Sequence, residues 1–163
     1  MDDAEVVTML RSVFSEVKGN DWRKNRFPIM SGVRQVSIDH PLFNDMARLF
    51  WLIDECRERR IVEAYDEMIE IIDYFSRTPG LNINDYSGLK QLFDASAIYF
   101  SYVWCENKQT LDKERPEKIF VRLADDECGF WTRAIVFALV TFDKGEIGYM
   151  DTPGGGIGNM DLD

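Results

Sequence analysis

The chain has 163 residues, of which 45% are hydrophobic, and a net charge of −10 at pH 7. The length fits a single domain, and the apolar content is too high for a disordered chain. The longest apolar run, 134–140, is far below the roughly 20 residues of a membrane span, and the acidic N-terminus lacks the apolar core of a secretory signal, so we expect a cytoplasmic protein without a membrane segment.

The N-terminal segment has the apolar spacing of an amphipathic helix. Its valines, leucine and phenylalanine recur every three or four residues over 3–18. Asp2 or Asp3 can cap the start of this helix, and Gly19-Asn20 can supply a left-handed residue at its end.

Two further helical regions follow. The segment 42–77 keeps helical spacing almost throughout, with a helix start expected at 39–41 and an end at the proline in 78–80. Because more than thirty residues is long for a helix in a globular domain, we expect a break near 57–60. A third long helix is predicted over 87–106.

Beyond residue 118 the apolar pattern changes to a period of two, which is typical of strands. We predict strands over 118–124, 130–142 and 146–150, joined by turns. The alternation near 33–38 is compatible with one extra strand. The expected fold class is therefore α+β, with three to four N-terminal helices packed on a C-terminal three-stranded antiparallel β-meander.

The chain is expected to form one α+β domain over 1–151. The remaining residues, 152–163, contain four of the eleven glycines and no periodic pattern, so we expect a flexible tail there.

Charge is distributed unevenly along the chain. Residues 1–60 carry ten acidic and ten basic side chains, whereas residues 61–163 carry nineteen acidic and nine basic ones. An acidic region cannot release counterions from nucleic-acid phosphates, so direct nucleic-acid binding is not expected. The imbalance favours a basic protein partner.

Carboxylates recur at helical spacing on the second half of the predicted helix 42–77. We propose them as a partner-binding face: Glu63, Asp66, Glu67, Glu70 and Asp73. A solvated helix face and a hard-cation site are alternative interpretations. A carboxylate centre in a helical bundle usually includes a Glu-x-x-His motif, which the sequence lacks, so no metal or cofactor is predicted.

The helix 87–106 contains more aromatic residues than one buried face can hold. Tyr99 and Tyr102 are therefore expected to be partly exposed and to serve as aromatic anchors for the partner. Packing of both tyrosines in the core is the alternative.

Other residues that could carry chemistry have simpler structural explanations. His40 beside Asp39 is expected to be a capping or surface histidine, and 125–127 to be an acidic turn rather than a cation site. The glycines of 154–158 lack the flanking elements of a phosphate loop. In 22–27, the aromatic residues are expected to anchor a loop to the core. The three cysteines, expected to be free thiols, are Cys56, Cys105 and Cys128.

No family motif is present, so the functional prediction depends on charge and on aromatic content. We predict that the protein is an acidic protein-binding module without enzymatic activity. The most specific form of this prediction is an immunity or antitoxin-type inhibitor of a basic nuclease toxin. A phage-type anti-defence protein that mimics nucleic acid, a small enzyme with a carboxylate-based or metal-assisted site, and an export chaperone or homodimeric scaffold stay open as alternatives. The oligomeric state is not predicted.

Overall fold

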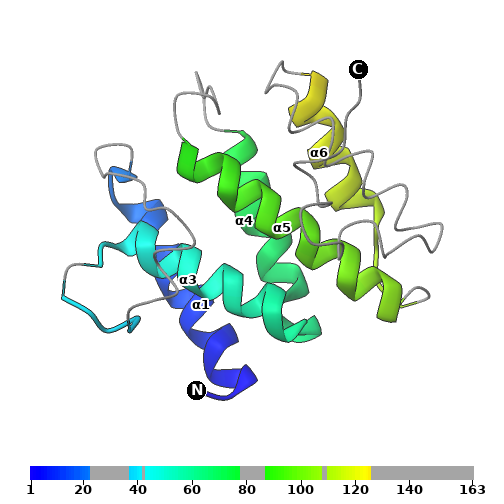
Figure 1. The fold of residues 1–163 in the computed structure, drawn as a ribbon. Helices are drawn as coiled ribbons and strands as arrows, with labels where there is room; N and C mark the ends of the chain where they lie inside the picture. The colour runs from blue at the N-terminus through cyan, green and yellow to red at the C-terminus, as the bar shows by residue number, and fades with distance from the viewer. Residues whose placement is uncertain (23–36, 42, 78–86, 108–109, 126–163) are drawn as a thin grey trace.

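The structure is a computed structural model that describes residues 1–22, 37–41, 43–77, 87–107 and 110–125. These residues form five α-helices and one short 3-10 helix (Figure 1). In chain order the elements are α1 (Asp3–Gly19), α3 (Asp45–Arg59), η2 (Val62–Ala64), α4 (Tyr65–Ser76), α5 (Ser87–Glu106) and α6 (Glu114–Asp125). Within the described residues, no helix is both long enough and apolar enough to cross a membrane.

Helix α1 follows the predicted pattern closely at its start. Asp2 caps it in a reciprocal capping box: the Asp2 carboxylate accepts from the Glu5 backbone N–H at 2.8 Å, and the Glu5 side chain accepts from the Asp2 N–H. The predicted left-handed end is wrong. Asn20 closes the helix in an extended conformation, with φ −115°.

The predicted break in the segment 42–77 is confirmed. Helix α3 ends at Arg59, Arg60 takes the left-handed conformation with φ 53° and ψ 48°, and the chain continues into η2 and α4. The predicted start at 39–41 is wrong, because α3 begins at Asp45. Asn44 caps it by accepting from the backbone N–H of Ala47 at 2.8 Å.

The predicted α+β fold is wrong for the part of the chain that the structure describes, which is about 80% helical and contains no strand. The first strand of the expected meander, 118–124, belongs to α6 instead. A strand would place Ile119 and Val121 on one face and Phe120 on the other. In the structure Ile119 and Phe120 are both buried and Val121 is 45% exposed, which is the spacing of a helix face.

The other predicted strands are not tested in the same way. The segments 130–142 and 146–150 and the domain boundary at 151 lie outside the described residues. In the predicted extra strand only residues 37 and 38 are described, and they form a turn rather than a strand.

The helices pack around one apolar core. Helix α1 packs against α3 and α4, α3 packs against α5, and α4 also contacts α5 and α6. In Figure 1, α1 and α6 lie on opposite sides of the molecule, with α4 and α5 between them. Phe100 lies at the centre of the aromatic part of the core. The centroid of its ring is 5.4 Å from that of Tyr65, 5.2 Å from that of Tyr99 and 6.2 Å from that of Phe120.

Candidate partner-binding surface on helix α4

The five predicted acids occupy the outward side of α4 and of the 3-10 helix before it. The inward side buries apolar residues such as Met68, Ile72 and Phe75 in the core. Glu63, Asp66 and Glu70 are exposed, while Glu67 and Asp73 are half-buried. The helical spacing thus brings the five carboxylates onto one surface, but their environments differ.

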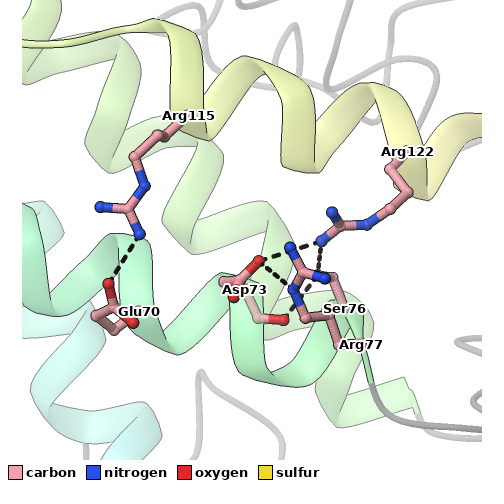
Figure 2. A network of polar contacts seen from close by, with 6 residues as sticks. All are labelled: Glu70, Asp73, Ser76, Arg77, Arg115 and Arg122. Atoms are coloured by element: carbon pink, nitrogen blue, oxygen red, sulfur yellow. Dashed lines mark hydrogen bonds and ion pairs between the residues drawn. The ribbon is translucent and has the colours of Figure 1, made fainter.

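Two of these carboxylates are bound by arginines from neighbouring helices. Arg11 on α1 forms an ion pair with Glu67, in which its Nε donates at 3.0 Å. Arg115 on α6 donates from Nη2 to Oε1 of Glu70 at 2.8 Å (Figure 2). The α4 surface is therefore joined to α1 on one side and to α6 on the other.

Asp73 accepts hydrogen bonds from two different arginines. Its Oδ1 accepts from Arg77 Nε at 2.8 Å and from Arg122 Nη2 at 3.3 Å (Figure 2). Arg122 also donates to the Ser76 hydroxyl oxygen, and that hydroxyl donates to the Asp73 carbonyl oxygen at 2.8 Å. Two guanidinium groups share this carboxylate, so it has little capacity left for an external cation.

The remaining two acids, Glu63 and Asp66, form no ion pair with any residue that the structure describes. The charge of Asp66 acts on the Tyr65 hydroxyl together with those of two further carboxylates, Asp112 just before α6 and Glu117 in its first turn. The charges of Glu63 and Asp66 act on the Tyr99 hydroxyl. We call this group the acidic corner: Glu63, Asp66, Asp112 and Glu117.

The electrostatic effect of the acidic corner is visible at Tyr65. The pKa of Tyr65 is raised to about 12, mainly by burial; a hydrogen bond from Trp104 opposes the shift, and the negative charges of Asp112, Asp66 and Glu117 contribute to it. That bond runs from the Trp104 indole N–H to the Tyr65 hydroxyl oxygen at 2.8 Å, and Tyr65 donates in turn to the Asp112 carbonyl oxygen. The tyrosine thereby holds the start of α6 beside the start of α4.

The two predicted aromatic anchors have different surroundings. Tyr99 is fully buried and donates its hydroxyl to the Ile61 carbonyl oxygen at 2.7 Å, so it cannot reach a partner in this fold. Tyr102 is half-buried, and the guanidinium of Arg60 lies over its ring at 4.3 Å from the centroid. Of these two tyrosines, only Tyr102 exposes part of its side chain to solvent.

Several other predicted features can be placed in the structure. His40 lies half-buried in the turn before α3, with its ring 6.2 Å from that of Phe43. Trp22 is confirmed as an anchor: it is buried and donates to the Tyr74 hydroxyl at 3.0 Å. Cys56 and Cys105 are free thiols, as predicted. Cys128, the glycines of 154–158 and most of 125–127 lie outside the described residues, and no group of metal-binding residues occurs among the described ones.

Sequence reasoning missed the cations that neutralise the α4 surface and two members of the acidic corner. Arg11, Arg115 and Arg122 are separated from their α4 partners by 56, 45 and 49 residues. Asp112 and Glu117 fall between the predicted helix 87–106 and the predicted strand 118–124, where no element was expected. The only available signal was the alternation of acidic and basic residues in α6. It would have indicated contacts with α4 only if this segment had been predicted as a helix.

Comparisons with known proteins find no match: no family model matches the chain, and no curated protein or solved structure matches it either.

Proposed function

We propose that this chain is an acidic protein-binding module that binds a basic partner through the acidic corner. The observation that carries the proposal is the contrast within α4. Three of the five acids that the sequence singled out are already neutralised by arginines of the same chain, whereas Glu63 and Asp66 have no ion pair among the described residues.

The electrostatics of the whole chain support the same proposal. A net charge of −10 attracts a basic protein over long distances and speeds the encounter. The exposed carboxylates of the acidic corner would then accept hydrogen bonds from its lysines and arginines. The most specific partner that we propose is a cationic nuclease, because nucleases carry basic surfaces that bind phosphates. An acidic protein bound to that surface would block the substrate.

The test is capture of partners by the tagged protein from a lysate of its own cells, after nuclease treatment, at about 50 mM and about 500 mM salt. This change shortens the Debye length from above roughly 10 Å to below roughly 5 Å, so it separates electrostatic from apolar binding. We expect one basic protein, retained at low salt and weakened at high salt. The captured protein is then titrated against purified chain.

Two charge-matched double variants decide whether the acidic corner is the binding surface. Glu63→Gln with Asp66→Asn removes two carboxylates from the corner. Glu16→Gln with Asp39→Asn removes two exposed carboxylates elsewhere, and neither has an ion pair among the described residues. We expect only the first variant to weaken the complex and to reduce its salt dependence. Equal affinities of the two variants would exclude the acidic corner.

A further inference from the structure

Arg115 is an exposed cation that lies among the acids of the proposed partner surface. It extends from the first turn of α6 towards α4 and donates to Glu70 at 2.8 Å (Figure 2). The hydrogen bond to Glu70 raises the pKa of the Arg115 guanidinium, and the charges of Glu70, Asp73 and Asp112 raise it further. The Arg115 guanidinium therefore has the same acidic surroundings that an arginine of a basic partner would have on this surface.

The contact between Arg115 and Glu70 is easy to break. The Arg115 side chain is 54% exposed and that of Glu70 is 56% exposed, and such solvated pairs add little to stability. Helix α6 is held to the core by other residues, since Ile119 and Phe120 are buried and Arg122 bonds to α4 two turns further on. Arg115 can therefore leave Glu70 while α6 stays in place.

We propose that Arg115 is an internal competitor of the basic partner: it occupies Glu70 in the free protein and is displaced when a partner arginine or lysine binds that carboxylate. This inference depends on the proposed function, and it extends the surface from the acidic corner along α4 to Glu70. Binding then exchanges one exposed ion pair for another, so the internal pair reduces affinity and disfavours weakly basic partners.

A matched pair of variants tests the proposal. Arg115→Gln frees Glu70, whereas Lys118→Gln frees Glu114, which is paired with Lys118 within α6 at 2.6 Å. Each variant removes one positive charge from the exposed face of the same helix, so any difference between them reflects the position of the freed carboxylate. The probe is a short fluorescent oligo-arginine peptide, titrated by anisotropy at about 50 mM salt.

We expect Arg115→Gln to tighten peptide binding about threefold relative to Lys118→Gln, in line with the small energies of exposed pairs. The gain in affinity should disappear when Glu70→Gln is added to Arg115→Gln, because that substitution removes the freed carboxylate. The single and double variants together form a double-mutant cycle. Equal affinities of the two single variants, or a gain that survives Glu70→Gln, would overturn the competitor role.

The proposed function has a separate readout with the same peptide. If Glu63→Gln with Asp66→Asn binds as tightly as the wild type, the acidic corner is excluded, whatever the ratio between Arg115→Gln and Lys118→Gln. If none of the chains binds the peptide, both proposals are overturned. Circular dichroism of each variant verifies that the helices are intact.

Discussion

Tyr99 on α5 donates its hydroxyl hydrogen to the carbonyl oxygen of Ile61, across 2.7 Å, at the break between α3 and α4. The same carbonyl oxygen also accepts from the backbone N–H of Ala64 at 3.2 Å, at the start of the segment that leads into α4. The tyrosine therefore gives this carbonyl a second hydrogen bond, which joins α5 to the break between α3 and α4. The side chain predicted to contact a partner is instead a structural support for the helix break.

Replacement of Tyr99 by phenylalanine should destabilise the fold without affecting the partner surface. The variant keeps the ring in the core and leaves the Ile61 carbonyl with the Ala64 N–H as its remaining donor, so we expect a loss of about 0.5–1.5 kcal/mol in the free energy of unfolding. Urea denaturation measures the change. An unchanged midpoint would mean that water replaces the hydroxyl. The larger truncation Tyr99→Ala serves as the reference for loss of the ring.

The break itself has the hydrogen bonds of a Schellman motif. The Arg60 N–H donates to the Arg57 carbonyl oxygen at 3.3 Å, and the Ile61 N–H donates to that of Cys56 at 3.1 Å. Glycine is the usual residue at the left-handed position, but this chain has Arg60 there. The arginine side chain partly offsets the backbone strain, because it pairs with Glu106 at 2.7 Å and stacks over a tyrosine ring.

Two substitutions at this position separate backbone strain from side-chain contacts. Both Arg60→Gly and Arg60→Ala lose the side chain, but only glycine adopts the left-handed conformation without strain. We expect Arg60→Gly to be more stable than Arg60→Ala by about 1 kcal/mol, measured by thermal or urea unfolding. Equal stabilities would show that the backbone relaxes out of this conformation when the arginine is removed.

The long helices were predictable because their patterns extend over many turns. The predicted bounds of α5, 87–106, match those of the structure, and the break after α3 was expected from length alone. The burial of Tyr99 was also within reach. It lies three residues after Ser96 and four before Val103, both buried, so helical spacing places it on the inner face.

Helix α6 was missed because its local signals conflict. Its apolar run is short enough to fit a period of two as well as a helical period. Pro116 disfavours a helix interior, yet it is the third residue of α6, where the backbone N–H has no helical partner and a proline is tolerated. Long-range pairs such as Arg115–Glu70 leave no periodic signal, because only the packing of α6 on α4 brings the two residues together.

A pair of adjacent substitutions tests the helical structure of 114–125. Phe120 is fully buried, so Phe120→Ala should cost about 3–5 kcal/mol, whereas Val121 is 45% exposed and Val121→Ala should change stability by less than about 0.5 kcal/mol. A strand with Ile119 and Val121 directed inward predicts a substantial loss for Val121→Ala as well. Urea unfolding of both variants distinguishes the two structures.

The buried thiol of Cys56 should make the fold sensitive to alkaline pH. The pKa of Cys56 is raised from 9.0 to about 12, mainly by burial and also by the negative charge of Asp3, while the positive charge of Arg59 opposes the shift. The unfolded chain loses this proton near pH 9, whereas the folded chain keeps it until about pH 12. The stabilisation is therefore complete below pH 9 and is lost as the pH rises towards 12.

The measurement is the free energy of unfolding between pH 9 and pH 10, where most tyrosines of the unfolded chain are still protonated. In the wild type, Cys56 should contribute a fall that approaches about 1.4 kcal/mol per pH unit. Cys56→Ala should be less stable at pH 7, because it leaves a cavity, but its stability should fall less steeply above pH 9. Cys105→Ala, which removes a half-buried thiol, is the control that is measured beside the wild-type slope. If Cys56→Ala keeps the wild-type slope, the thiol does not stay protonated in the folded chain.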